Sequence, residues 1–301
     1  MKNIYVWWST SKTLRNYGDE LNPYIISKLS GYKVKYVPVL GPVLKSLYKA
    51  FFMLLYKRIT IFDIITLVRS FFKKRILVGI GSIIQWYEVA NAQIWGSGLI
   101  ESYGSIHNAD FLAVRGIITQ RRILELGYKA PLVLGDPALL LPLIYSPEIK
   151  SQYELGVIPH FRHYDEAVNM FKGTDVPVID LRSDDIELVT RTILSCKKIV
   201  SSSLHGLIVP HSYGIQAVWG QFFSSKLSGD DVKFLDYFSS VGILPYEPFR
   251  VTPDIDRLLL FFNEDWESRI LPQVDLKNIQ KELLRVAPFH LRDEFRSFIE
   301  L

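Results

Sequence analysis

Residues 198–219 read KIVSSSLHGLIVPHSYGIQAVW. An apolar run at Ile199–Ser201 ends in a serine-rich turn, a helical segment opens there, and a second apolar run covers Ala217–Trp219. A strand that is followed by a helix and then by another strand is typical of a parallel sheet whose faces are covered by helices. This segment therefore predicts an α/β fold.

The same alternation of strands and helices continues on both sides of this segment. Runs rich in Val and Ile predict strands at residues 4–8, 34–39, 76–80, 111–114, 132–134, 155–158 and 176–181, besides 199–201 and 217–219. Apolar residues at helical spacing predict helices at residues 20–29, 117–126 and 184–196. After Pro248 the chain is mostly helical in pattern.

The length of 301 residues suits two domains better than a single core. Proline and polar residues between positions 142 and 153 separate two strand–helix series, so we place the boundary there. We expect one domain over residues 1–145 and a second over residues 146–301. A terminal helix is expected to cross back to the first domain.

The composition excludes several classes of protein. Aromatic residues make up 13% of the chain and no long polar tract occurs, which excludes a disordered chain. The net charge of +4 is small, and without a zinc-finger, RRM or basic-helix pattern we expect no nucleic-acid partner. Cys196 is the single cysteine, so a reducing compartment is permitted. The first apolar run turns polar at Ser9 and is too short for a signal peptide, so we expect a cytoplasmic protein.

Residues 43–75 form a basic and strongly apolar insert. A single acid, Asp63, stands against eight basic residues, which are Lys45, Lys49, Lys57, Arg58, Arg69, Lys73, Lys74 and Arg75. The pattern predicts two amphipathic helices broken near residues 58–60, and no uncharged run approaches the roughly 18–20 residues that span a bilayer. Two interpretations stay open: a helical layer packed on the sheet with a solvated basic face, or a surface in peripheral contact with an anionic membrane.

Polar residues follow the predicted strands of the first half, where open α/β sheets bind ligands. They are Asn16, Gly18, Asp19, Gly96, Ser97 and Gly98. Asp19 is either a helix cap or a catalytic group, and the Gly-Ser-Gly loop is either an anion-binding loop or a plain turn. Arg115 either presents its guanidinium to an anionic substrate or pairs with a neighbouring acid. Asp136 either lies in a plain turn or anchors an arginine.

The second half carries a denser set of cationic and hydroxyl groups. His160 and Arg162 lie in the loop after residues 155–158, and three serines precede His205 at the start of a helix. Hydroxyls, helix N-terminal amides and an imidazole together indicate an anion site. His205 is either a general acid near neutral pH or a satisfied core histidine. No His-x-x-x-His or Cys-x-x-Cys spacing occurs, so we expect no metal site.

Seven segments resemble, in the same order, the polysaccharide pyruvyltransferase family. They are NYGDELNP (16–23), WGSGL (95–99), RGIITQRRILELG (115–127), GDPALLLP (135–142), IPH (158–160), SSSLHGLIVPHSYGIQAVWG (201–220) and KFLDYFSSVG (233–242). Together they cover most of residues 1–245, and the segment at 201–220 is the most specific. The resemblance implies two Rossmann-like domains that face a cleft, as in the GT-B glycosyltransferases.

The resemblance also implies a reaction and a set of roles. The donor is phosphoenolpyruvate, the acceptor is a sugar, free or lipid-linked, and the product is a pyruvate ketal; no further cofactor is implied. His205 is expected as the acid or a phosphate contact and Asp19 as the base. Ser203 stands where some members carry arginine, a charge that Arg162 is expected to replace. The expected donor-site residues are Arg115, His160, Arg162, Ser202, Ser203, Leu204, His205 and Lys233, and the expected acceptor-side residues are Asn16, Gly18, Asp19, Gly96, Ser97 and Gly98.

Two other functions fit parts of this pattern. A glycosyltransferase that uses a nucleotide sugar would share the fold, although no acidic ribose contact or base slot is evident in the second half. A non-catalytic glycan-binding protein on an enzyme fold is the other alternative, because fold alone never settles function. For Lys233, a position on an exposed helix surface is the alternative to a role at the donor site.

Overall fold

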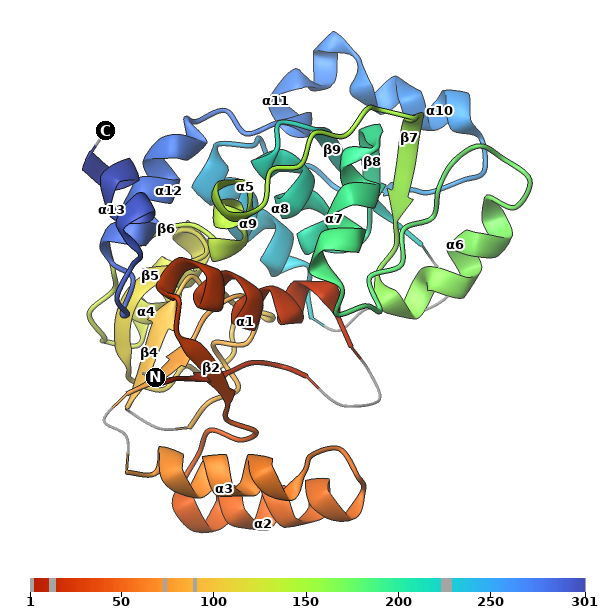
Figure 1. Cartoon of the computed structure of the whole chain (residues 1–301). Helices are drawn as coiled ribbons and strands as arrows, with labels where there is room; N and C mark the ends of the chain where they lie inside the picture. The colour runs from red at the N-terminus through yellow and green to blue at the C-terminus, as the bar shows by residue number, and fades with distance from the viewer. Residues whose placement is uncertain (1–2, 11–14, 73–74, 89–90, 223–228, 301) are drawn as a thin grey trace.

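The computed structural model describes residues 3–10, 15–72, 75–88, 91–222 and 229–300. Two parallel β-sheets carry the fold, with helices around them (Figure 1). The six-stranded sheet has the order β2-β1-β3-β4-β5-β6 and the four-stranded sheet has the order β10-β9-β8-β7. The predicted α/β class is confirmed, and both sheets are Rossmann-like. Lys73 and Lys74 of the basic insert lie outside the described residues.

The strands divide between the two halves of the chain. The six-stranded sheet contains β1 (Asn3–Trp7), β2 (Lys33–Tyr36), β3 (Ile76–Val78), β4 (Ala92–Trp95), β5 (Asp110–Val114) and β6 (Val133–Leu134). The four-stranded sheet contains β7 (Tyr153–Ile158), β8 (Cys196–Ser201), β9 (Gln216–Gln221) and β10 (Phe249–Arg250). All of these pairings are parallel. Strands β3 and β4 are buried along their whole length, as central strands covered on both faces require.

Eight of the nine predicted strands are present. The prediction at residues 176–181 is wrong, because this segment makes only an isolated bridge between Val178 and Val157. Pro177 has no N–H group and cannot continue a ladder. Strands β4 and β10 were not predicted from the sequence. Strand β4 carries a polar residue, Gln93, whose amide donates to Asp110 Oδ2 at 3.0 Å.

Four helical segments belong to the first sheet: α1 (Tyr17–Ser30), α4 (Ile117–Glu125), η1 (Pro137–Leu140) and α5 (Leu141–Ile144). Helix α1 contains Pro23, which cannot donate to the carbonyl of Asp19 four residues earlier. Asn22 compensates, because its Nδ2 donates to the Asp19 carbonyl at 3.1 Å. The same amide exchanges two hydrogen bonds with the backbone of Ile80. Asn22 thereby fixes α1 to the loop after β3.

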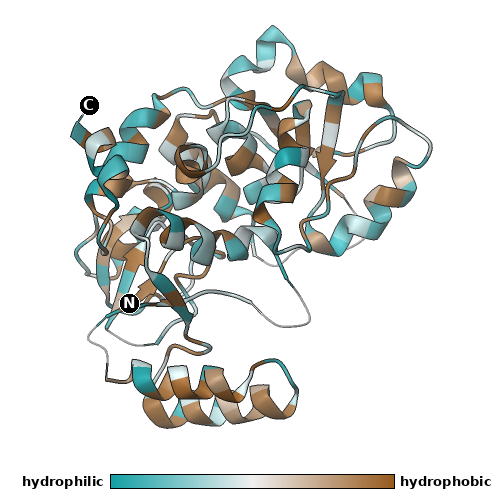
Figure 2. Ribbon diagram, in the orientation of Figure 1, coloured by the Kyte–Doolittle hydropathy of each residue, from teal (hydrophilic) through white to brown (hydrophobic). Residues whose placement is uncertain are grey.

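The basic insert forms two helices, α2 (Val43–Leu55) and α3 (Ile61–Ser70), as predicted. They lie below the first sheet in Figure 1, and Figure 2 shows that both consist largely of apolar residues. Thr60 and Asp63 form a reciprocal capping box that begins α3. Within the described residues, no helix is both long and apolar enough to cross a bilayer.

The remaining helical segments follow β7 and run to the end of the chain. Around the second sheet lie η2 (Phe161–His163), α6 (Tyr164–Met170), α7 (Ile186–Leu194), α8 (His205–Ser212) and α9 (Val232–Val241). The C-terminal series is α10 (Ile255–Leu259), η3 (Leu260–Phe262), η4 (Glu264–Trp266), α11 (Glu267–Ile270), α12 (Leu276–Arg285) and α13 (Asp293–Glu300). Helix α12 lies against the first sheet, where Trp95 Nε1 donates to the Leu283 carbonyl at 2.9 Å.

The largest buried core combines side chains from both halves of the chain. Val6 and Leu21 from the first half share it with Ile199 and Trp219 from the second. The expected boundary at residue 145 falls between β6 and β7. The division into two domains that face a cleft stays a prediction.

Candidate functional site

A cavity of about 500 Å³ opens where strands from both sheets end. The loops after β1, β3, β7 and β8 all contribute to it, and these are the carboxyl ends of parallel strands, where α/β folds bind ligands. The volume is typical of a small-molecule site. The lining residues are Ser9, Thr10, Asn16, Asp19, Arg58, Gly81, Ser82, Ile83, Trp86, Ile100, His160, Phe161, Arg162, Ser203, Leu204, His205 and Lys233.

The turn between β8 and α8 is fixed by its own serines. Ser201 Oγ donates to the Ile158 carbonyl at 2.8 Å and accepts from the Ser203 amide at 3.0 Å. Ser202 Oγ accepts from the His160 amide at 2.9 Å, which ties this turn to the loop after β7. Ser203 lines the cavity whereas Ser202 braces it. Helix α8 begins just beyond, so its first amides lie at the cavity edge.

His205 lies beside a buried carboxylate. Its Nε2 atom is 3.7 Å from Asp136 Oδ2, and neither atom has a hydrogen-bond partner within the described structure. The other oxygen of Asp136 accepts from the Ala138 amide at 2.9 Å, which fixes the carboxylate in place. Of the two alternatives for Asp136, the turn is confirmed, because Asp136 caps the start of η1. Its Oδ2 atom faces a histidine and not an arginine.

Gly18 packs directly on the ring of His205. A Cβ atom at position 18 would lie 2.1 Å from His205 Nδ1, so only glycine allows α1 to approach this closely. Gly18 does not line the cavity; it fixes one side of the imidazole.

Asp19 lines the cavity and is half-buried. Its Oδ2 atom accepts from Asn16 Nδ2 at 2.8 Å. Burial raises the pKa of Asp19 from 3.8 to about 6, although Asn16 and His205 act in the opposite direction. The N-cap of α1 is Asn16, so the alternative of Asp19 as the helix cap is wrong. Asp19 is an acid that changes charge near neutral pH inside the cavity.

Lys233 lies in the first turn of α9 and is almost fully buried against the cavity. The alternative of an exposed helix-surface lysine is therefore wrong. Burial, together with the charges of Arg115 and Arg162 and against the opposing charge of Asp231, lowers the pKa of Lys233 from 10.5 to about 8. Because this value stays above 7, Lys233 is mostly cationic at neutral pH.

His160 and Arg162 reach the same cavity from the loop after β7. Burial, followed by the charge of Lys233, lowers the pKa of His160 to about 3, so this imidazole is neutral. Its Nδ1 atom accepts from the Arg162 amide at 3.3 Å, which leaves the proton on Nε2 as a donor. The Arg162 guanidinium is exposed, and no carboxylate of the described residues pairs with it.

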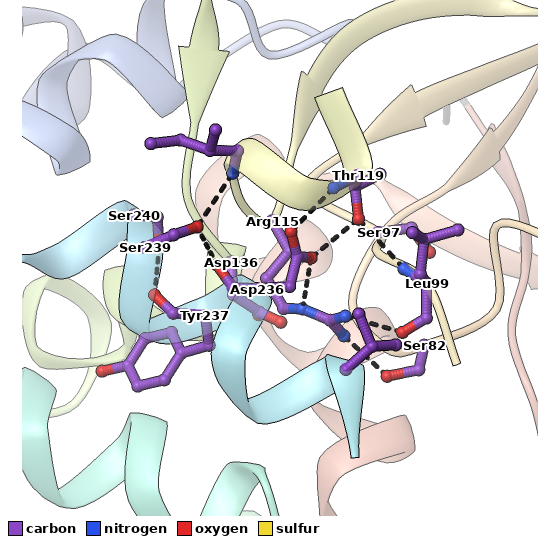
Figure 3. Close-up of polar contacts among 12 residues, drawn as sticks. Ser82, Ser97, Leu99, Arg115, Thr119, Asp136, Asp236, Tyr237, Ser239 and Ser240 are labelled. Atoms are coloured by element: carbon purple, nitrogen blue, oxygen red, sulfur yellow. Dashed lines mark hydrogen bonds and ion pairs between the residues drawn. The ribbon is translucent and has the colours of Figure 1, made fainter. Parts of the chain in front are cut away.

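Arg115 lies outside the cavity lining and is fully buried (Figure 3). Its Nε atom is 3.0 Å from Asp236 Oδ2 on α9, and its other nitrogens donate to Ser82 Oγ at 2.6 Å and to the Leu99 carbonyl at 2.7 Å. Asp236 also accepts from the amide and hydroxyl of Thr119. All three guanidinium nitrogens thus have partners within the protein. The structure therefore supports the alternative for Arg115, an ion pair with a neighbouring acid, and not direct contact with the donor.

The Gly-Ser-Gly loop supports this ion pair and does not line the cavity. Ser97 Oγ donates to the Gly81 carbonyl at 2.8 Å. A Cβ atom on Gly98 would lie 2.4 Å from Arg115 Cζ, and Gly96 adopts a φ of 90° against Pro137. The loop is therefore a close-packed turn, and the anion-binding interpretation is replaced.

Several lining residues escaped sequence reasoning. Ser9 and Thr10 follow β1, so the rule that pointed to the other strand ends also applied to them. Arg58 comes from the turn of the basic insert, for which no local signal exists. In the described part of the chain, no group of three or more His, Cys, Asp and Glu side chains could hold a metal ion.

The chain is similar to known proteins over most of these elements. The sequence profile described as "Polysaccharide pyruvyl transferase" matches residues 4–219. An uncharacterized protein of Acanthamoeba polyphaga mimivirus is 33% identical over 181 residues, which are 56% of this chain and 63% of that protein. The chain thus spans less than two thirds of that curated relative. No solved structure matches it significantly. Because the profile covers the first sheet and the His205 turn, the chain belongs to the polysaccharide pyruvyl transferase family.

Proposed function

We propose that this protein transfers the enolpyruvyl unit of phosphoenolpyruvate to a sugar of a surface polysaccharide or its precursor, forming a pyruvate ketal and releasing phosphate. Besides family membership, the charge of the cavity supports the proposal. Arg58, Arg162 and Lys233 line it, and Asp19 is the one acid among the lining residues that the structure describes. A small cavity with excess positive charge suits a donor that carries both a carboxylate and a phosphate.

The donor groups have specific partners in this proposal. Lys233 is a buried point charge that favours the phosphate, and the fork of Arg162 suits either anion. His160 Nε2–H, the Ser203 hydroxyl and the first amides of α8 complete the donor side. Arg115 does not contact the donor in this proposal. It acts indirectly, because its hydrogen bond holds the side chain of Ser82 in the cavity wall.

The reaction requires one proton on carbon and one on phosphate. His205, which lies beside the Asp136 carboxylate, gives a proton to the methylene carbon of the donor, and a cationic centre develops at C2. One sugar hydroxyl adds to C2, the C2–O bond to phosphate breaks, and the second hydroxyl closes the ketal. Of the two hydroxyl protons, one replaces the proton that His205 gave to carbon and the other leaves with phosphate. Asp19 takes up a hydroxyl proton.

The pH dependence of the rate tests the role of Asp19. With a pKa of about 6, Asp19 is a carboxylate above this pH, so kcat/KM is expected to fall about tenfold per pH unit below it. Asp19→Asn should abolish this acidic limb and lower the rate roughly 10²–10⁴-fold. The effect of pH on folding stability has the opposite sign. The pKa of Asp19 in the folded protein lies above the ordinary value of 3.8, so protonation of Asp19 favours the folded state. This contribution is fully present below pH 3.8 and is lost as the pH rises through about 6. An unchanged acidic limb in Asp19→Asn would assign the limb to another group.

Calorimetric titration with phosphoenolpyruvate tests the donor site. Lys233→Met keeps the length of the side chain but removes a charge that contacts the donor. A hydrogen bond to a charged group contributes about 1.5–3 kcal/mol, so Kd should rise roughly 10- to 150-fold. Lys172→Met is the matched control, because Lys172 is exposed and lies outside the cavity lining.

Two outcomes would contradict the proposal. Wild-type protein that binds a UDP or GDP sugar and no phosphoenolpyruvate would favour the nucleotide-sugar transferase. Phosphoenolpyruvate binding that weakens equally in Lys233→Met and Lys172→Met would place the donor outside this cavity.

A further inference from the structure

Helices α2 and α3 are rich in apolar residues (Figure 2), and many of their large apolar side chains are exposed to solvent. The four most exposed side chains of this surface are Leu44 at 84%, Tyr56 at 74%, Phe62 at 74% and Phe72 at 85%. We call this surface the apolar hairpin face; it consists of Val43, Leu44, Leu47, Tyr48, Phe51, Phe52, Leu55, Tyr56, Ile61, Phe62, Ile65, Val68 and Phe72. A patch of this extent on a folded chain marks an interaction site.

The two helices are inverted relative to ordinary surface helices. On α2 the buried residues are Ser46 and Ala50, and on α3 they are Leu67 and Ser70. Met53, Leu54 and Ile64 also pack partly against the core. Most of the large apolar side chains of the two helices nevertheless face outward. A surface helix of a water-soluble protein has the opposite arrangement. The outward face is consequently built to be covered.

The charge of the insert identifies what covers it. Residues 43–75 carry eight basic residues and one acid, a net charge of +7, whereas the whole chain has +4. The rest of the chain is therefore net negative, and the positive charge is concentrated here. The one acid, Asp63, is occupied in the capping box with Thr60. Lys45 and Lys49 pair with Glu88, and Arg75 pairs with Asp110. Lys57 and Arg69 are exposed and pair with no carboxylate of the described residues. Two copies of this surface would repel each other through these charges, whereas an anionic surface attracts them.

We propose that the apolar hairpin face docks on the surface of an anionic lipid bilayer. Its large side chains enter the boundary between headgroups and acyl chains, and the exposed Lys57 and Arg69 contact lipid phosphates. With 13 and 10 residues, α2 and α3 are well short of the roughly 20 residues that span a bilayer, so they lie in its plane.

The docked hairpin also orients the cavity. Arg58, in the turn between α2 and α3, lines the cavity, so its mouth lies close to the headgroups. An acceptor sugar carried on a membrane lipid then reaches the cavity at the bilayer surface. This last step, unlike docking itself, rests on the proposed function.

Vesicle flotation tests docking without any substrate. The full chain should float with vesicles of phosphatidylglycerol and phosphatidylcholine, and at least about tenfold less with phosphatidylcholine alone. Leu44→Ser/Phe62→Ser should weaken partition to the mixed vesicles about tenfold or more, because two large apolar side chains no longer enter the bilayer. Lys57→Gln/Arg69→Gln should lose most of the preference for anionic lipid.

The matched control is Leu132→Ser, which removes a leucine that is 93% exposed beside β6, at the opposite edge of the six-stranded sheet from the hairpin. Its partition should equal that of wild type. Wild-type protein that fails to float, or equal losses in the hairpin and control variants, would overturn the proposal. So would a lipid-free dimer that sedimentation shows to dissociate in Leu44→Ser/Phe62→Ser without any vesicle binding. Calorimetric binding of phosphoenolpyruvate should be unchanged in the hairpin variant, which separates failure of docking from failure of the proposed function.

Discussion

His205→Gln is expected to lower kcat for ketal formation roughly 10²–10⁴-fold, the usual contribution of a general acid. Glutamine fills similar space and keeps a polar group, but it cannot give a proton to the methylene carbon of the donor. The Kd for phosphoenolpyruvate should change by less than about tenfold, because Lys233 and Arg162 still line the cavity. Phosphate release in single-turnover assays measures the first quantity and calorimetry the second.

Two further variants sharpen this test. Asp136→Asn should reproduce part of the loss in kcat, because it removes the negative charge that lies 3.7 Å from His205 Nε2, beside the group that gives up the proton. His107→Gln, which changes an exposed histidine outside the cavity lining, should have no effect. Wild-type turnover in His205→Gln, in a protein that melts like wild type, would remove His205 from the mechanism.

Asp236→Ala is expected to lower the free energy of unfolding by about 3–5 kcal/mol, the usual cost of leaving one member of a buried ion pair without its partner. Arg115 and Asp236 are both fully buried, and Asp236 accepts from Thr119 as well. The variant therefore leaves a guanidinium, an amide and a hydroxyl without their acceptor. The midpoint of urea unfolding, followed by circular dichroism, measures the effect.

A surface ion pair provides the comparison. Glu154 pairs with Lys197 and Lys198, but all three side chains are partly or largely exposed. Glu154→Ala should cost less than about 1 kcal/mol because solvent screens such pairs. Arg115→Met combined with Asp236→Leu should recover part of the loss seen in Asp236→Ala, although Thr119 stays unsatisfied. Equal effects of Asp236→Ala and Glu154→Ala would show that the buried pair contributes little.

Local pattern was enough to predict most of the fold. Strands such as β7 and β8 are apolar runs that end in polar turns, and helix α1 has its buried residues at helical spacing. Each of these signals is local, because it is formed by residues that are close together in the sequence. Strand β4 was missed because Gln93 interrupts a short apolar run, and residues 176–181 were overpredicted because the effect of Pro177 on pairing outweighs the apolar pattern.

The site was predictable where its residues follow strand ends directly. His160, Arg162, Ser203 and His205 all line the cavity for this reason. Arg115 also follows a strand, but its partner Asp236 is 121 residues away, and no local pattern distinguishes a buried ion pair from a free guanidinium. The +7 charge of residues 43–75 was visible in the sequence, whereas the outward direction of its large apolar side chains required the structure.

The distance between Arg115 and Asp236 along the chain also affects how the protein folds during synthesis. A ribosome adds about 5–20 residues per second, so the 121 residues between them take about 6–24 s to appear. The indole N–H of Trp95 donates to the carbonyl of Leu283, which is synthesised 188 residues later, so this hydrogen bond forms later still. During this interval Arg115 Nε lacks its carboxylate partner and the indole N–H of Trp95 lacks its acceptor, at positions that are buried in the finished protein. The N-terminal half therefore completes its buried polar contacts only after most of the chain has been synthesised.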